Sequence, residues 1–279
     1  MSIIWGAALP IVKPSLEIIS PFQFLFFRYL IAAPLTLPIF IFYLFRLKLN
    51  RQTLLKIFAL EFLGTPLLLP ILYFGLQQTS SIEASLIGAT GPIFIVLGGI
   101  FFLHEKEETK EWQGLTLSFI GTLILIIEPI FSGNHFTAFS FSGNLLILCY
   151  NLLYTIYVLL AKKIYKSIPK LFITSFSYFI SIISFYLFLL FLGQSASIFL
   201  LTIPSVSLAA GYMAIFGSII ALTLFLYGQN LIEASEASLF TYLQGIIALP
   251  VAYFFLHEKT TYPQIIAVLI IAIGIFIGL

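Results

Sequence analysis

One carboxylate, Glu61, lies well inside a long apolar segment, where an ionisable side chain is costly and usually functional. It stands about two helical turns from the start of its segment and shortly before Gly64-Thr65-Pro66. A carboxyl group at that depth can take up and release a proton, so Glu61 is our candidate for proton coupling. Packing, or snorkelling to the interface, is the structural alternative.

A second ionisable residue inside an apolar segment is Arg28, about two turns from the expected outer end of that segment. We interpret it as a structural or gating residue, anchored by an outer glutamate such as Glu83 or Glu128. The rise per residue puts it roughly 15 Å in depth from Glu61, so the two are not expected to pair.

Uncharged polar side chains occupy the middle of several other apolar segments. On one of them Asn144, Asn151, Tyr154 and Thr155 share a helical face. Polar groups at that depth need partners, either in neighbouring helices or in a hydrated cavity. We favour a cavity and predict these substrate-binding residues: Trp5, Thr90, Asn151, Tyr154, Tyr242 and Gln244.

Three further residues are predicted to be structural or gating residues. Pro92 interrupts an apolar segment, Glu83 forms a capping box with Ser80, and Glu236 complements the dipole at a helix start. Two His-Glu-Lys triplets, at 104–106 and 257–259, lie on opposite sides of the expected membrane and cannot share an ion. We therefore expect no metal site, no cofactor and no catalytic residue.

Composition requires that these residues be positioned by membrane helices. The 279 residues are 61% hydrophobic and 9% charged, typical of a polytopic membrane protein. All eleven acidic residues are glutamate, which argues against aspartate-based membrane enzymes. A nucleotide-binding P-loop is absent, the lone Cys149 permits no internal disulfide, and a net charge of +2 gives no reason to expect nucleic acid.

Charges, prolines and Ser/Gly clusters divide the chain into ten apolar segments. Only helices or closed barrels satisfy their backbone hydrogen bonds in lipid, and runs this long without period-2 alternation are interpreted as transmembrane helices. Ten of the thirteen basic residues fall in even-numbered connections, so both termini are predicted to be cytoplasmic. The segments are 2–16, 22–45, 54–77, 82–103, 112–130, 143–161, 171–192, 205–230, 235–256 and 262–279.

The chain repeats itself at an offset of 153 residues. The tetrad EASL occurs at 83–86 and 236–239, and the hexad FFLHEK at 101–106 and 254–259. Five segments per copy is an odd number, so the second copy must cross in the opposite sense. We predict an all-α fold of two five-helix inverted repeats, at 1–131 and 143–279, joined by an outside linker at 132–142. Such transporters bind substrate between the repeats.

Several motifs together resemble the EamA family of the drug/metabolite transporter superfamily. They include Trp5-Gly6 in the first segment, Arg28 after Ser20-Pro21, Pro92 thirteen residues before Glu105, and the run from Tyr150 to Tyr157. The resemblance covers essentially the whole chain and implies a ten-helix exporter of the inner membrane. Two features depart from the family pattern: Gly245 replaces a proline, and fewer residues than usual precede the Trp-Gly pair.

We therefore predict a multi-pass inner-membrane secondary transporter that exports a small organic metabolite by alternating access. A cavity of amides, hydroxyls and rings suits an amino acid or a similar neutral or zwitterionic solute, aromatic ones included. The alternatives are a facilitative, channel-like carrier, a membrane enzyme, or a structural membrane protein that transports nothing. Expected partners are the solute and the lipid bilayer but no nucleic acid, and the protein is expected to be a monomer or a weak dimer.

Overall fold

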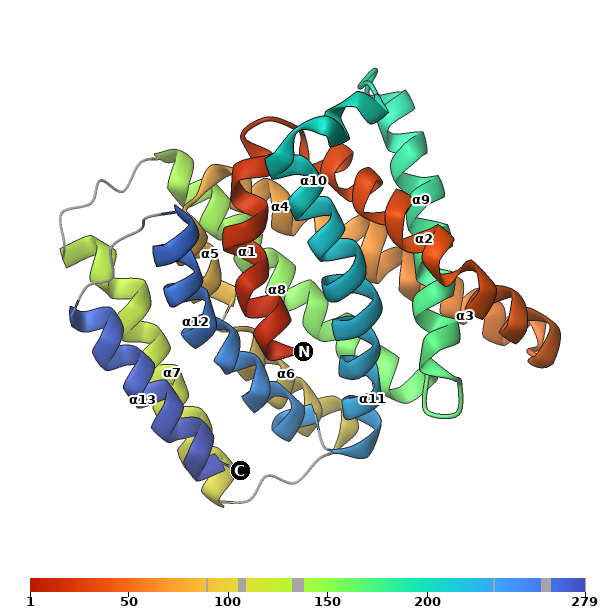
Figure 1. Cartoon of the computed structure of the whole chain (residues 1–279). Coiled ribbons are helices and arrows are strands. Elements are labelled where there is room, and N and C mark those ends of the chain that lie inside the picture. The colour runs from red at the N-terminus through yellow and green to blue at the C-terminus, as the bar shows by residue number, and fades with distance from the viewer. Residues whose placement is uncertain (89, 105–108, 132–137, 233, 257–261, 279) are drawn as a thin grey trace.

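The structure, a computed structural model, describes residues 1–88, 90–104, 109–131, 138–232, 234–256 and 262–278. Within these ranges the regular elements are all helices (Figure 1). The α-helices are α1 (Ser2–Leu16), α2 (Pro21–Arg46), α3 (Arg51–Phe62), α4 (Leu68–Gln78), α5 (Ser81–Gly88), α6 (Gly91–Gly98), α7 (Thr109–Phe131), α8 (Ala138–Ile164), α9 (Lys170–Phe191), α10 (Pro204–Tyr212), α11 (Thr223–Leu231), α12 (Ala234–Leu256) and α13 (Tyr262–Gly278). Three π-helical segments, η1 (Leu63–Leu67), η2 (Gly99–Leu103) and η4 (Met213–Leu222), and a 3-10 helix, η3 (Ile198–Thr202), complete the set.

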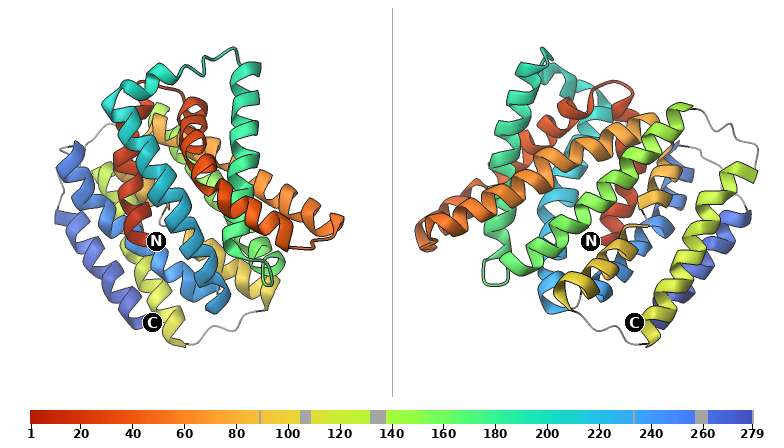
Figure 2. Two further views of the ribbon diagram at one scale, coloured as in Figure 1. Left: turned by 45° about the vertical axis from the view of Figure 1, so that its right-hand side comes forward. Right: turned by 180° about the vertical axis from the view of Figure 1, so that it is seen from behind.

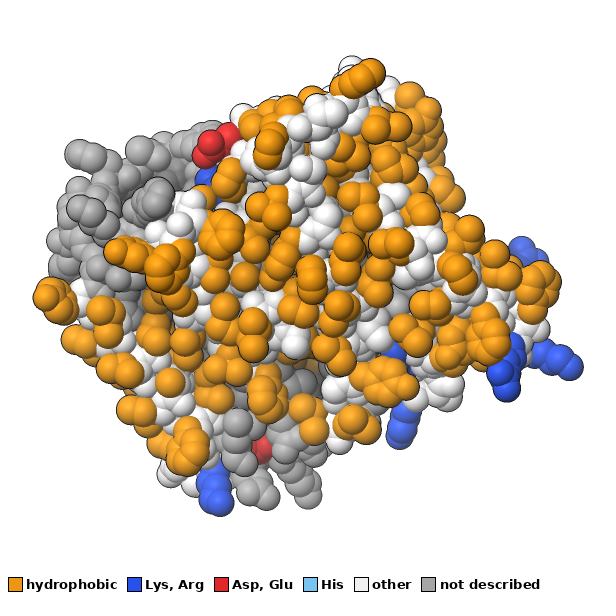
Figure 3. Space-filling view, in the orientation of Figure 1, with side chains coloured by type: hydrophobic (Ala, Val, Ile, Leu, Met, Phe, Trp, Pro, Cys, Tyr) orange, Lys and Arg blue, Asp and Glu red, His pale blue; other side chains and the backbone are white. Residues whose placement is uncertain are grey.

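The helices carry the apolar surface of a membrane protein. Among the described residues, five helices are long and apolar enough to cross a bilayer: Pro21–Arg46, Arg51–Gln78, Phe141–Ile164, Lys170–Phe191 and Pro204–Gly228. Four shorter apolar helices accompany them. Hydrophobic side chains cover the face seen in Figure 3, and most Lys and Arg side chains gather at its lower and right-hand edges. The prediction of a multi-pass membrane protein agrees with this surface, and the count of ten crossings stays a prediction.

Local sequence signals explain where several helices begin. Ser20 and Gln23 form a reciprocal capping box ahead of Pro21, which starts α2. The side chain of Asn50 accepts a hydrogen bond from the backbone of Thr53 at 2.7 Å and so caps α3. The Asn50 cap starts α3 directly after the α2–α3 connection, so the basic residues Arg46, Lys48 and Arg51 lie at or next to the helix ends.

Two long helical rods, α3–η1–α4 and α10–η4–α11, are each interrupted by a π-helical segment at a matching position. In the first, η1 separates α3 from α4 and contains Pro66, which lacks the N–H group that an α-helix needs at that position. In the second, η4 separates α10 from α11 without a proline, and the hydroxyl of Ser218 donates to the Met213 carbonyl five residues earlier at 2.9 Å. Both interruptions lie at the centre of the molecule, where the candidate site is found.

Contacts between helices come in pairs that follow the sequence repeat. Helix α2 packs against its counterpart α9, and α7 against its counterpart α13 (Figure 2). The α3–α4 rod contacts α8, and its counterpart, the α10–α11 rod, contacts α1; likewise α12 contacts α1 while α6 contacts α8. A two-fold relation between two copies of one unit produces this exchange, so the fold has the two-repeat architecture expected from the sequence.

One predicted boundary differs from the structure. The linker was expected to extend to Ser142, but α8 already begins at Ala138. Residues 138–142 include Phe139 and Phe141, which are as compatible with a helix end as with a loop. The serines between and after them made this stretch resemble a loop in the sequence. The rest of the predicted linker, 132–137, lies outside the described residues.

Candidate functional site

A cavity of about 190 Å³ lies between the two halves of the molecule. Its wall is built by α1, α2, η1, α4, α5 and α6 from the first half, and by α8, η4 and α12 from the second. Most of the lining is apolar or aromatic, with a few convergent polar groups, which is the usual composition of a small-molecule site. The side chains come from segments far apart in sequence, so only the folded pair of repeats forms the site.

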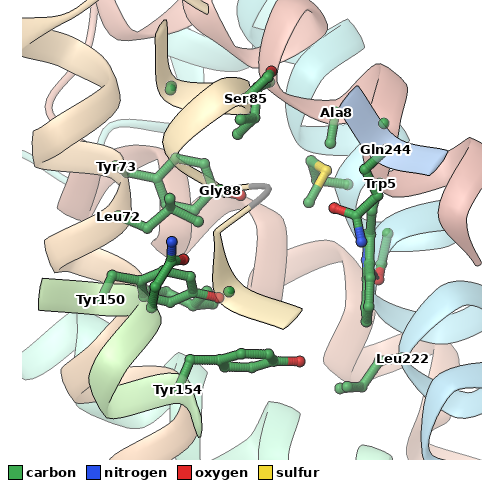
Figure 4. A pocket seen from close by; sticks show the side chains of 18 of the residues that line it. Trp5, Ala8, Leu72, Tyr73, Ser85, Gly88, Tyr150, Tyr154, Leu222 and Gln244 are labelled. Carbon is green, nitrogen blue, oxygen red and sulfur yellow. Dashed lines mark hydrogen bonds between the residues drawn. The ribbon is translucent and has the colours of Figure 1, made fainter. Parts of the chain in front are cut away.

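Aromatic rings form two opposing walls of this cavity. Figure 4 shows Trp5 and Gln244 on one side and Tyr73, Tyr150 and Tyr154 on the other. The indole of Trp5 is fixed by a hydrogen bond from Nε1 to the Gly217 carbonyl at 3.0 Å. Tyr150 and Tyr154 stack with ring centroids 5.4 Å apart. Flat rings held in this way offer π faces to a solute with an apolar or cationic part.

Phe225 contacts a ring from each of the two aromatic walls. Its ring centroid lies 5.3 Å from that of Trp5 and 6.4 Å from that of Tyr154. The three rings therefore make a continuous aromatic contact from α1, through α11, to α8. Because the rings come from both repeats, relative motion of the repeats would separate or compress them.

Asn151 connects α8 to the break between α5 and α6. Its amide nitrogen donates to the Ile87 carbonyl at 2.7 Å and to the Thr90 hydroxyl at 3.2 Å. The Thr90 hydroxyl donates in turn to the same carbonyl at 2.7 Å. Asn151 and Pro92 lie on the cavity wall, whereas Thr90, predicted to bind substrate, is not among the lining residues and instead accepts a hydrogen bond from Asn151.

Glu61 is almost completely buried, with 1% of its surface exposed. Its Oε1 atom accepts hydrogen bonds from Tyr165 at 2.6 Å and Tyr157 at 3.1 Å, while Oε2 has no hydrogen-bond partner among the described residues. Tyr157 itself lines the cavity. Gly64, one turn after Glu61, leaves the space that the Tyr157 ring fills. A single phenol thus connects the buried carboxylate with the cavity.

Tyr165 closes this hydrogen-bonded group from the end of α8. It lies just beyond the helix, and burial, with the Glu61 carboxylate adding to the effect, raises the pKa of its phenol well above the usual 10.0. Tyr165 therefore stays a hydrogen-bond donor at any physiological pH.

Arg28 is also buried, with 5% of its surface exposed, and it lies on the cavity wall. Its Nε atom donates to the Ser218 hydroxyl at 2.8 Å and Nη1 to the Tyr73 hydroxyl at 3.1 Å. The guanidinium carbon stands 5.1 Å from the centre of the Tyr29 ring. Glu61 bonds to tyrosines instead, so the expectation that Arg28 and Glu61 do not pair is consistent with the described contacts.

The structure brings together part of the set proposed from sequence. Trp5, Asn151, Tyr154 and Gln244 line the cavity, as do Arg28 and Pro92, which were expected to have structural or gating roles. The side chains of Tyr242, Glu83 and Glu236, and that of Glu128, lie outside the described residues. Within the described part of the chain, His, Cys, Asp and Glu residues form no cluster that could hold a metal ion.

Sequence reasoning missed several residues of the wall, chiefly tyrosines. Tyr150 and Tyr157 were missed, but they recur at helical spacing with the predicted Tyr154 on α8, and that spacing could have predicted an aromatic face. Tyr29 and Tyr73 carry no comparable signal, because neither belongs to a series of tyrosines at helical spacing, and each reaches the cavity only through tertiary packing.

Comparison with known proteins agrees with this architecture. Residues 1–127 and 141–279 each match the EamA-like transporter family. An uncharacterized transporter of Archaeoglobus fulgidus is 22% identical over 99% of this chain and 93% of its own length. The uncharacterized transporters YcxC and YdfC of Bacillus subtilis are 27% and 28% identical, over 98% and 92% of this chain and 88% and 81% of their own lengths.

The fold also has a counterpart among solved structures. One crystal structure superposes with a TM-score of 0.78 at 16% sequence identity, covering 99% of this chain and 93% of the other. Two successive matches to one family, together with helices that pair across a repeat, identify the chain. It belongs to the EamA-like transporter family and is a membrane transporter rather than an enzyme.

Proposed function

We propose that the protein is a secondary transporter that exports a small organic metabolite from the cell through its inner membrane. The observation that carries the proposal is the central cavity, whose aromatic and amide-bearing wall is shared between the two repeats. Ten helices in two inverted five-helix repeats, with both termini cytoplasmic, would let the repeats rock about this cavity and open it to each side in turn. An amino acid or a similar solute, aromatic ones included, fits its rings and amides.

Glu61 is proposed as the proton-coupling residue. The carboxylate is shielded from solvent, is held on one oxygen by Tyr157 and Tyr165, and has its other oxygen unpartnered among the described residues. Protonation would change its hydrogen bonding with Tyr157, and Tyr157 contacts the cavity. The phenol is therefore the route by which the protonation state of Glu61 affects solute binding.

Flux measurements in proteoliposomes test this function. Labelled amino acids are loaded, and efflux and uptake are followed with and without an imposed pH gradient for the wild type, for Glu61→Gln, and for Glu17→Gln as a control at an exposed carboxylate. We expect gradient-driven flux in the wild type and in Glu17→Gln, and flux at background level in Glu61→Gln. The Gln variant keeps an acceptor for the two tyrosines but cannot exchange a proton.

Two other outcomes would change the proposal in different ways. Flux that ignores both the gradient and the Glu61→Gln substitution would identify a facilitative carrier and leave Glu61 a structural role. Absence of flux from the folded wild-type protein for the whole panel would reject amino acids as substrates.

A further inference from the structure

Arg28 is a buried cation whose charge has no counter-ion among the described residues. Its described partners are all neutral: the hydroxyl groups of Ser218 and Tyr73 and the ring of Tyr29. The buried carboxylate of Glu61 accepts hydrogen bonds from Tyr157 and Tyr165 and makes no ion pair with Arg28. Burial of a charge without an opposite charge is expensive, and hydroxyl groups compensate only part of that cost.

One nitrogen of the guanidinium remains available. Nε and Nη1 are used by Ser218 and Tyr73, which fix the plane of the group. Nη2 makes no hydrogen bond with a described residue, yet it is not among the buried atoms that lack a partner, so it is accessible from the cavity that Arg28 lines. Arginine in this state presents preformed donors for an acceptor that arrives with a ligand.

The surrounding wall indicates what kind of anion fits. Among the described lining residues Arg28 is the single charged side chain, so the site can neutralise one negative charge and not the two of a phosphate ester. The rest of the wall near it is aromatic, including Tyr29, Tyr73 and Tyr150. A ligand with one carboxylate and an apolar or aromatic body matches both features.

We propose that Arg28 is a substrate-binding residue that recognises the carboxylate of the transported solute, with the body of the solute against the rings of Trp5 and Tyr154. This assignment rests on the proposed transport function and makes it more specific, since it requires a carboxylate where the transport proposal requires only a small organic solute. Tyr73 and Ser218 are positioning residues that hold the guanidinium in its plane.

Binding of matched probes to the purified protein tests the assignment. The chain has two tryptophans, so Trp112→Phe, at an exposed position on α7, leaves Trp5 as a fluorescent reporter on the cavity wall. Phenylacetate and phenylacetamide differ in charge but hardly in shape, and L-phenylalanine and L-phenylalaninamide form a second pair. We expect each acid to bind about 10- to 100-fold more tightly than its amide.

Variants of Arg28 complete the test in the same background. Arg28→Gln should lower the affinity for each acid to that for the amide and leave the amide unchanged, whereas Arg28→Lys should keep part of the preference. If Arg28→Gln proves too unstable to purify, the comparison of each acid with its amide in the protein with native Arg28, and the part of the preference that Arg28→Lys keeps, still decide the assignment. Equal affinity for acid and amide in the protein with native Arg28, or binding of neither, would overturn the assignment.

Flux of the same four probes separates this assignment from the transport function. Acid-selective binding without flux into proteoliposomes would support the carboxylate site and reject transport of these solutes. Flux without preference for the acids would reject the carboxylate site and leave the transport function intact.

Discussion

The π-helical segments η1 and η4 occupy equivalent places in the two repeats, yet they carry different chemistry. At the 153-residue offset Gly64 corresponds to Gly217 and Thr65 to Ser218, and both glycines line the cavity. One turn earlier, however, Glu61 corresponds to Ala214. The comparison shows that the break in the helix is common to both copies, whereas the buried acid belongs to one.

The hydroxyl groups of the two segments also have different partners. Thr65 hydrogen-bonds to Ser177 of α9 at 3.1 Å, and Ser218 accepts a bond from Arg28 of α2 at 2.8 Å. The first repeat therefore supplies Arg28 and Glu61, whereas the second repeat supplies the Ser177 and Ser218 hydroxyl groups and the tyrosines of α8 that contact Glu61 or line the cavity. A duplicated fold has become chemically asymmetric without losing its symmetric pattern of helix contacts.

The largest expected contrast between the segments concerns their glycines. In Gly64→Ala the new Cβ would overlap the Tyr157 ring, which cannot swing away because it is buried and bonded to Glu61, and we expect a loss of about 1–3 kcal/mol in the free energy of unfolding. In Gly217→Ala the Cβ meets the flexible thioether of Met213, 2.7 Å from its Cε, so the loss should be much smaller.

Denaturant titration of both glycine variants in detergent measures this contrast. Equal destabilisation of the two proteins would mean that the segments are packed alike and that the rigidity assigned to Tyr157 is wrong.

A smaller contrast is expected for the two hydroxyl groups. Ser218→Ala removes an acceptor from a buried guanidinium, which should cost about 1.5–3 kcal/mol, whereas Thr65→Val removes a bond between neutral groups, which should cost about 0.5–1.5 kcal/mol. The same titration compares them, and Phe→Leu at exposed Phe276 serves as a control outside the core. A larger loss for Thr65→Val would indicate that the charge of Arg28 is compensated elsewhere.

The smallest expected effect is a dependence of the unfolding free energy on alkaline pH, which comes from Tyr165, the hydrogen-bond partner of Glu61 of the first repeat. Because the folded protein raises the pKa of Tyr165, the unfolded chain releases this proton first, from about its usual value of 10.0 upward. The stabilisation is thus fully present below pH 10 and is lost above it, by at most about 1.4 kcal/mol per pH unit. Tyr165→Phe should flatten the curve of unfolding free energy between pH 9 and 11, and an unchanged slope would show that the phenol titrates normally.

The sequence was sufficient for much of the architecture. Helix α1 begins and ends where its apolar segment does, and most other segments agree with the structure to within a few residues, because continuous apolar runs bounded by charges leave few alternatives. The π-helical turns of η4 could not be predicted in the same way, because the segment contains no proline. They depend instead on contacts such as the hydrogen bond from Ser218 to the Met213 carbonyl.

The candidate site was predictable only in part. Asn151 and Glu61 stood out because polar groups are rare at that depth, and both are central in the structure. Arg28 also stood out, but its depth alone suggested an anchor near the surface, and its place on the cavity wall depends on how α2 packs against η4. Spacing along one helix cannot reveal contacts between helices that are 190 residues apart in sequence.

The packing of α1 has a consequence for the order in which the protein is assembled. Its contacts are mainly with α12 and with the α10–α11 rod, and three of its polar contacts, through Ser2, Ile4 and Trp5, are made with residues beyond position 211. Helix α1 is synthesised long before these partners, so it can complete its packing only after most of the second repeat has been made. A fragment that ends after the first repeat would leave α1 without its main neighbours, so the two halves are expected to mature together rather than one after the other.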